Sequence, residues 1–217
     1  MHDAISIETI ATWIPRWHQR LFRLARAVVS SDGEATSVVY AAYLKLISHL
    51  RPGSREGEIA RRLDEFVFLG AMRERVRFRG QMLRLLDAAA GSEPSVENEI
   101  ASPDGNAPRD GRAHSGAPGK QGDVIADSLS DMLRIVFVLI DVIGMEPADV
   151  ANMLHLQAAT VDSRVQRARS VVRALMKDQG VNELPEIYAV NESQCRAAVA
   201  FLRTRVTASE QRVPASV

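Results

Sequence analysis

The chain has a single cysteine, few aromatic residues and no excess charge of either sign. Cys195 is alone, so an internal disulfide and a cysteine-cluster metal site are both excluded. Basic and acidic side chains number 27 each. Because a globally basic coat is therefore excluded, any contact with nucleic acid has to come from a local patch. No apolar run is long enough to span a bilayer and no signal-peptide pattern opens the chain, so we expect a cytoplasmic protein without membrane insertion.

Signatures of catalysis are missing as well. The histidines are scattered without metal-ligand spacing, and no glycine-rich phosphate loop follows a strand. No segment has the alternation that predicts a strand. We therefore expect an all-α protein that is not an enzyme and has no catalytic residue, metal or cofactor.

Charge and composition change along the chain. Residues 1–89 carry 14 basic and 10 acidic side chains, a net of +4, whereas residues 90–126 carry 3 and 6, a net of −3. The acidic part is rich in glycine, proline, serine and asparagine and has almost no large apolar residue, so it cannot bury enough surface to fold. We predict two small helical domains, 1–89 and 127–177, joined by a flexible linker at 90–126 and followed by a C-terminal extension at 178–217.

Apolar residues at helical spacing predict three helices in the first domain. The first follows Pro15, which suits a first helical turn, and ends at the polar run 30–33. The second ends at 51–53, and the third runs from about Glu58 toward Arg79. The predicted core positions are Trp17, Leu21, Leu24 and Val28 in the first helix, and Ala35, Val38, Val39, Ala42, Leu46, Ile47 and Leu50 in the second.

The third helix ends in alternating arginines, Arg73, Arg75, Arg77 and Arg79, with Phe78 among them. Alternation spreads the guanidinium groups around the helix, so they cannot all be buried. An exposed basic cluster beside an aromatic ring suits backbone contact and base stacking on opened DNA. The alternative is a solvated helix end.

Residues 147–169 predict a helix-turn-helix. This motif requires a small residue where its helices cross, a tolerant residue in the turn, and a branched apolar residue that seats the second helix. Ala151, His155 and Val161 occupy these places. Glycine is usual in the turn because φ is positive there, and histidine is among the other residues that visit this region. The alternative is an ordinary helical hairpin with a solvated arginine face.

The second helix of this motif separates an apolar stripe from a basic face. Off the stripe, guanidinium groups can reach phosphates or guanine edges, and Thr160 can cap the helix and aim its first amides outward. The predicted stripe is Val161, Val165, Ala168, Val172 and Leu175, and the predicted DNA-binding residues are Thr160, Ser163, Arg164, Arg167 and Arg169.

Two further helices flank the motif. An apolar helix directly before it is its natural support, and Asn191 with Gln194 can cap a last helix near the C-terminus. We expect the last helix to dock on the second domain or to remain loosely attached. The predicted apolar residues are Leu129, Leu133, Val136, Phe137, Ile140 and Ile143 in the support helix, and Cys195, Ala198 and Leu202 in the last one.

In this order, the segments resemble a bacterial RNA polymerase sigma factor of the extracytoplasmic-function (ECF) class, over roughly three quarters of the chain. Residues 21–50 look like the polymerase-binding helices of the family, and 66–80 like the segment that melts and holds the minus-ten promoter element. Residues 128–169 look like the domain that reads the minus-thirty-five element. This last match is the most specific, because the apolar helix, the Gly144 that ends it, the helix-turn-helix and the TVxSRxxRAR pattern occur in family order.

The resemblance implies binding to core RNA polymerase and to promoter DNA by recognition alone. It places Thr36, Ser37, Tyr40, Ala41 and Leu44 on the polymerase-binding surface. The family usually has an acidic pair where this chain has Thr36 and Ser37, and often Gln and Glu where it has Tyr40 and Ala41. The surface is therefore short of negative charge.

Hydroxyl groups in place of the acidic pair suggest a phosphorylation switch. A phosphate adds about −1.5 to −2 charge, which can supply what two carboxylates otherwise provide against a basic polymerase surface. The hypothesis is that a serine/threonine kinase activates the protein at Thr36, with Ser37 as the second candidate. The alternative is that both residues simply favour a helix start.

Two other functions stay open. One is a sigma mimic that binds an anti-sigma protein and never touches DNA, which the missing acidic pair favours. The other is a dimeric helix-turn-helix repressor, which would need a dimerisation surface that the sequence does not reveal. Co-purification with core polymerase separates these alternatives from a sigma factor.

Overall fold

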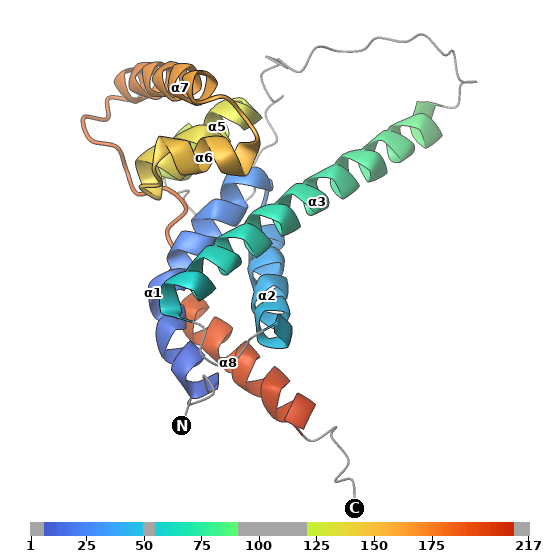
Figure 1. Ribbon diagram of the computed structural model, residues 1–217. Coiled ribbons are helices and arrows are strands. Elements are labelled where there is room, and N and C mark those ends of the chain that lie inside the picture. The colour runs from blue at the N-terminus through green and yellow to red at the C-terminus, as the bar shows by residue number, and fades with distance from the viewer. Residues whose placement is uncertain (1–6, 50–54, 91–120, 211–217) are drawn as a thin grey trace, which may run out of the picture. The chain divides into compact units, whose positions relative to one another are not determined.

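The computed structural model describes residues 7–49, 55–90 and 121–210, and the regular structure in these ranges is entirely helical (Figure 1). The predicted all-α class is therefore confirmed. Most of the predicted flexible linker, residues 91–120, lies outside the described residues.

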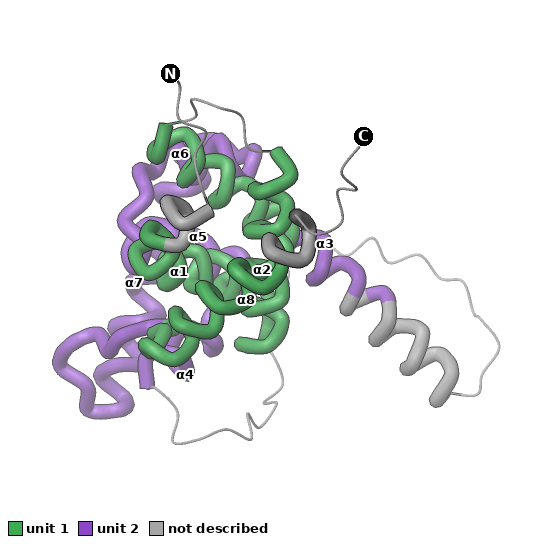
Figure 2. Tube along the Cα trace, turned by 90° about the horizontal axis from the view of Figure 1, so that it is seen from below, with its two compact units in different colours: residues 1–71, 188–217 green, residues 72–187 purple. Residues whose placement is uncertain are grey.

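Contacts divide the chain into two compact units whose boundaries differ from the predicted domain ranges (Figure 2). Unit 1 comprises residues 1–71 together with 188–217, and unit 2 comprises residues 72–187. One long helix, α3 (Glu56–Ala90), carries the chain from unit 1 into unit 2, and the chain returns to unit 1 after Ile187. The predicted C-terminal extension is consequently shared between the units.

Helix α1 (Ile7–Val28) opens unit 1 and begins well ahead of Pro15. The prediction that Pro15 lies in the first turn is wrong. Ile14, directly before the proline, is fully buried, and the rings of Trp13 and Trp17 lie 5.2 Å apart across the proline. Burial on both sides of Pro15 extends the helix despite the hydrogen bond that a proline removes.

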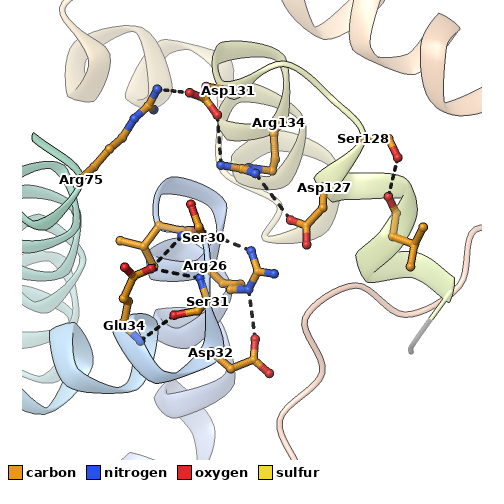
Figure 3. Close-up of polar contacts among 12 residues, drawn as sticks. Arg26, Ser30, Ser31, Asp32, Glu34, Arg75, Asp127, Ser128, Asp131 and Arg134 are labelled. Atoms are coloured by element: carbon orange, nitrogen blue, oxygen red, sulfur yellow. Dashed lines mark hydrogen bonds and ion pairs between the residues drawn. The ribbon is translucent and has the colours of Figure 1, made fainter. Parts of the chain in front are cut away.

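Helix α2 (Asp32–His49) starts with a reciprocal cap. The backbone N–H groups of Ser30 and Ser31 each donate to Glu34 Oε2 at 3.1 Å, and the N–H of Glu34 donates to Ser31 Oγ at 3.2 Å (Figure 3). The predicted stripe is buried as far as Leu46, Ile47 is half-buried, and Leu50 lies outside the described residues. The buried residues of α2 are Ala35, Val38, Val39, Ala42, Tyr43 and Leu46.

The first half of α3 is held in unit 1 by an apolar stripe and by ion pairs with α1. Arg20 Nη2 lies 2.8 Å from Asp64 Oδ2, and Arg16 Nη2 lies 2.9 Å from Glu56 Oε1. The stripe recurs every four residues, which places its members on one face of the helix. Its buried members are Ile59, Leu63, Val67 and Ala71.

Helix α8 (Glu192–Glu210) completes unit 1 by packing mainly on α1 and also against α2 (Figure 1). Its predicted cap is confirmed, since the N–H groups of Asn191 and Gln194 each donate to the other's side-chain oxygen at 2.9 Å. Ala198 and Leu202 are buried, as predicted. The expectation that this helix docks on the second domain or stays loosely attached is wrong, because it forms part of the core of unit 1.

Unit 2 stacks a support helix on the helix-turn-helix, and α5 makes its main packing contacts with α7. The support helix changes from α to π geometry without a break, and a π turn takes an extra residue that rotates the side chains beyond it around the helix axis. Ile140 and Ile143, predicted to be core from α-helical spacing, are therefore only half-buried, whereas Val138 and Leu139 are buried. Gly144 ends the helix at φ 77°, as predicted. The elements are α4 (Gln121–Asp127), α5 (Asp131–Phe137), η1 (Val138–Val142), α6 (Pro147–Leu154) and α7 (Ala158–Asp178).

The end of the predicted linker is folded, since residues 121–126 belong to α4. A Cβ atom at Gly122 would lie 2.4 Å from the carbonyl oxygen of Glu186 and 2.8 Å from that of Pro185. Only glycine allows the backbones to approach so closely. Because a glycine packed in this way looks like a linker glycine in the sequence, the predicted linker extends too far.

His18 on α1 makes the stability of unit 1 depend on pH. Its side chain is 2 % exposed, and Nδ1 lies 3.2 Å from the phenol oxygen of Tyr43. Burial lowers the pKa of His18 from 6.5 to about 4. At pH values between about 4 and 6.5, His18 is protonated in the unfolded chain and neutral in the folded chain. The folded state therefore loses stability as the pH falls through this range.

We therefore expect the free energy of unfolding of unit 1 to fall by about 3 kcal/mol as the pH drops from about 6.5 to about 4. Denaturant titrations followed by circular dichroism across this range measure it. In a His18→Phe variant this part of the pH dependence should vanish, whereas replacing the exposed His49 with Gln should retain it. An identical pH profile for wild type and His18→Phe would contradict the assignment.

Candidate nucleic-acid and polymerase interfaces

The turn between α6 and α7 depends on a left-handed residue. His155 has φ 53° and ψ 44°, and its N–H donates to the carbonyl of Asn152 at 3.3 Å. The N–H of Leu156 donates to the carbonyl of Ala151 at 2.9 Å. These two bonds form a Schellman motif, which closes the C-terminus of α6. The positive φ predicted at His155 is confirmed.

The packing of the two helices agrees with the predicted helix-turn-helix. Ala151 and Val161 are buried where α6 and α7 meet, and Leu175 at the far end of the stripe is half-buried. The stripe between them is buried throughout, at Val161, Val165, Ala168 and Val172. The opposite side of α7 is left for contacts outside the unit.

The first turn of α7 differs from the prediction. The N-cap is Gln157, and Thr160 lies inside the turn, where its N–H donates to the Gln157 carbonyl at 3.0 Å. Thr160 therefore does not cap the helix, because the chain becomes helical two residues before it. Its carbonyl accepts a 3.0 Å hydrogen bond from the exposed Ser163 hydroxyl. Both of these predicted DNA-binding residues lie near the start of α7, where Thr160 is half-buried and Ser163 is exposed.

The predicted arginines of α7 lie in three different environments. Arg167 is exposed. Arg164 is half-buried, and its Nη1 is shielded from solvent without a hydrogen-bond partner among the described residues. A buried donor without an acceptor costs about 1–3 kcal/mol of free energy. A hydrogen bond from Arg164 to an oxygen of a bound partner molecule is therefore favourable. Arg169 is already engaged within unit 2.

Arg169 forms a two-pronged ion pair with Asp141 of η1. Nη2 lies 2.6 Å from Oδ1, and Nε lies 2.9 Å from Oδ2. The hydrogen bond and the charge of Asp141 raise the pKa of Arg169 above its ordinary value. The pair ties the recognition helix to its support helix. Sequence spacing gave no sign of this structural role, because the two residues are 28 positions apart.

The arginine cluster predicted on α3 does not act as one surface. Arg73 and Arg77 are exposed, and Arg77 Nη1 lies 3.7 Å from Glu74 Oε2. The side chains at 78 and 79 lie outside the described part of the chain. Arg73 and Arg77 are one turn apart, so they share a face that can meet a phosphate backbone.

Arg75, the remaining member, belongs to a charge network inside unit 2. It pairs with Asp131, which also accepts from Arg134 Nη2 at 3.3 Å (Figure 3). Arg134 Nη1 lies 3.5 Å from Asp127 Oδ1. Since Arg134 has no exposed surface, its charge requires these carboxylates. The network was missed in the sequence because Arg134 lies within an otherwise apolar segment.

The hydroxyl groups that replace the expected acidic pair are held against the backbone of α2. Thr36 Oγ1 donates to the carbonyl of Asp32 at 2.8 Å, and Ser37 Oγ donates to that of Gly33 at 2.9 Å. Ser37 is exposed, whereas Thr36 is half-buried. Both residues lie in the first turns of α2, and the Ser37 side chain is the more accessible to solvent.

The acidic residues at the start of α2 are engaged locally. Asp32 Oδ1 lies 3.0 Å from Nε of Arg26, a residue that is itself buried, and Glu34 is part of the N-terminal cap (Figure 3). From Thr36 to Leu44 the helix contains no acidic residue. The predicted polymerase-binding surface thus lacks carboxylates of its own.

The predicted polymerase-binding residues lie on two faces of α2. Ser37, Ala41 and Leu44 are exposed and follow helical spacing, so they form one open face. Thr36 and Tyr40, one turn apart, form a second face that is half-buried. The ring of Tyr40 stacks on Phe201 of α8, with centroids 4.4 Å apart and planes at 21°.

The described residues hold no group of three or more His, Cys, Asp and Glu side chains that could bind a metal ion. Cys195 is unpaired and half-buried on α8. None of the helices in the described ranges combines the length and apolar character needed to cross a membrane.

Comparison with known proteins supports the resemblance seen in the sequence. The "ECF RNA polymerase sigma factor SigE" of Mycolicibacterium smegmatis is 24% identical over 171 residues, which are 74% of this chain and 61% of that relative's length. The sigma factor RpoE of Bartonella quintana, solved in complex with the anti-sigma factor NepR, matches with a TM-score of 0.50 and 19% identity over 78% of this chain and 95% of that chain. At such identity the structural match establishes the fold alone. No protein-family signature matches the chain. The resemblance to ECF sigma factors is confirmed.

The contrast between Arg167 and Arg169 gives a test of the recognition face. Arg167→Ala should weaken binding to an upstream promoter duplex by about 1–3 kcal/mol and leave stability unchanged, because the side chain is exposed. Arg169→Ala should lower the free energy of unfolding by about 1 kcal/mol, and Asp141→Ala should do the same. The double variant should cost no more than either single one. Fluorescence anisotropy and thermal unfolding supply the two measurements.

Loss of the upstream contact should be seen in Arg164→Ala as well. If the Arg164→Ala and Arg167→Ala proteins both bind the duplex as tightly as wild type at several salt concentrations, α7 does not read DNA through this face.

Proposed function

We propose that this chain, whose sequence and fold resemble those of ECF sigma factors, binds core RNA polymerase and directs it to promoters. The observation that carries the proposal is the helix-turn-helix of unit 2, with its left-handed turn at His155, its buried valine stripe and its outlying Arg164 and Arg167. The similarity to SigE spans 74% of the chain and so reaches beyond this motif.

In this proposal the chain contributes recognition and no bond chemistry. In unit 2, α7 reads the upstream element, and the part of α3 that carries Arg73 and Arg77 captures the opened strand. In unit 1, α2 binds polymerase. Phosphate contacts position the chain, and contacts to base edges give it specificity. Nucleotide transfer belongs to the polymerase.

Reconstitution with core RNA polymerase tests the proposal. The full-length chain should co-elute with core polymerase and should start transcription at a subset of promoters from a genomic library. Arg164→Ala with Arg167→Ala should reduce transcription while leaving co-elution intact. Absence of both co-elution and transcription, for the unmodified and the phosphorylated chain, would exclude a sigma factor.

We further propose that a serine/threonine kinase supplies the missing charge on α2. Two observations support this. The surface from Thr36 to Leu44 contains no carboxylate, and the nearest acidic residues, Asp32 and Glu34, already have partners. A phosphate near the N-terminus of a helix is also favoured by the helix dipole. The exposure of Ser37 makes it as good an acceptor as Thr36.

Acidic substitutions test this switch. Thr36→Glu or Ser37→Glu should raise the affinity for core polymerase about ten- to a hundredfold, since a new charge-assisted hydrogen bond contributes about 1.5–3 kcal/mol. Ser48→Glu is the matched control, because Ser48 is a hydroxyl residue near the other end of α2 and should change little. If the unmodified chain binds as tightly as both acidic variants and the phosphorylated protein, no switch exists at this site.

A sigma mimic that captures an anti-sigma protein is the second candidate. The absence of carboxylates on the open face of α2 favours it, and the Bartonella quintana protein of similar fold was crystallised with an anti-sigma factor. The two candidates differ in one outcome. A mimic binds a purified anti-sigma protein in every modification state and never joins core polymerase.

A further inference from the structure

We infer that α8 is an internal ligand of the α2 surface and competes there with core polymerase. The inference rests on the proposed function, because it concerns the surface that polymerase would use. It adds a role for the C-terminal segment 188–210, called here the C-terminal latch.

The first observation is what the latch covers. Phe201 stacks on Tyr40, one of the predicted polymerase-binding residues, at a centroid distance of 4.4 Å. Thr36 lies one turn before Tyr40 on the same half-buried face of α2. The open face of α2 is therefore only part of the predicted surface, and the ring of Tyr40 becomes free only when Phe201 has left.

The second observation is how the latch is attached. Within the described part of α8, Ala198 and Leu202 are buried and Cys195, Val199 and Phe201 are half-buried, so the helix docks through one apolar side. Exposed arginines occupy other positions of the helix. A helix docked through one side can open as a local unit while the other helices of its bundle stay folded.

Hydrogen–deuterium exchange of the full chain, alone and bound to core polymerase, measures the latch directly. In the free protein, amides of α8 should be protected together with those of α1. In the complex, the α8 amides should exchange at least about tenfold faster while α1 stays protected. Unchanged protection of α8 in a saturated complex would overturn the inference.

Phe201→Ala is the matching variant, with Thr204→Ala as its control on an exposed position of α8. Loss of the stacked ring pair should weaken latch docking and raise the affinity for core polymerase about tenfold, whereas Thr204→Ala should leave it unchanged. Alanine keeps the helix intact, and circular dichroism verifies that the variant is folded. Equal or weaker polymerase binding by Phe201→Ala would contradict the inference.

Failure of the inference and failure of the proposed function give different results. If wild type and Phe201→Ala bind polymerase alike, the latch does not compete and the sigma assignment stands. If neither binds, even as Thr36→Glu forms, both the sigma assignment and the competition are wrong.

Discussion

The left-handed backbone of His155 is the constraint on which the candidate DNA-reading unit depends. It ends α6 and turns the chain within three residues, so that Ala151 of α6 and Val161 of α7 are both buried. Once this crossing is set, helical geometry decides which residues of α7 are buried and which lie outside. The pair between Arg169 and Asp141 then holds the helix on its support. The basic face is therefore a consequence of packing on the other side.

Electrostatics inside the chain explain why its neutral overall charge does not describe its surfaces. Several charges near the candidate interfaces are engaged internally, as in the pairs of Arg75 with Asp131 and of Arg26 with Asp32. Arg134 is buried and depends on two carboxylates. What remains for partners is local, namely exposed arginines on α3 and α7 and an open face of α2 without acidic residues. Counting charges along the sequence cannot separate the side chains that are paired inside the chain from those that are available to partners.

The discontinuous composition of unit 1 has a functional consequence. A C-terminal helix that returns to the first bundle makes the chain cross between the units twice, once through α3 and once before Tyr188. The second crossing leads into a helix whose Phe201 stacks on Tyr40 of α2. The chain thus covers part of its own α2 surface, with no additional domain required.

The sequence by itself determined the features that depend on local rules. Helical periodicity predicted the buried stripes of α2 and α7, and the helix-turn-helix pattern predicted the positive φ at His155. The spacing of two capping residues predicted the cap formed by Asn191 and Gln194. Each depends on residues within a few positions of one another. The motif order along the chain was enough to identify the similarity to ECF sigma factors.

Only the tertiary structure decided the features that join distant residues. The packing of Gly122 against the backbone at 185–186 and the stacking of Phe201 on Tyr40 both depend on approaches between segments far apart in the chain. The π turn in η1 changed which residues of an apolar run were buried, and spacing rules assume that such a turn is absent. Local patterns specify which face of a helix is buried, but what it packs against is selected by the free energy of the whole assembled core.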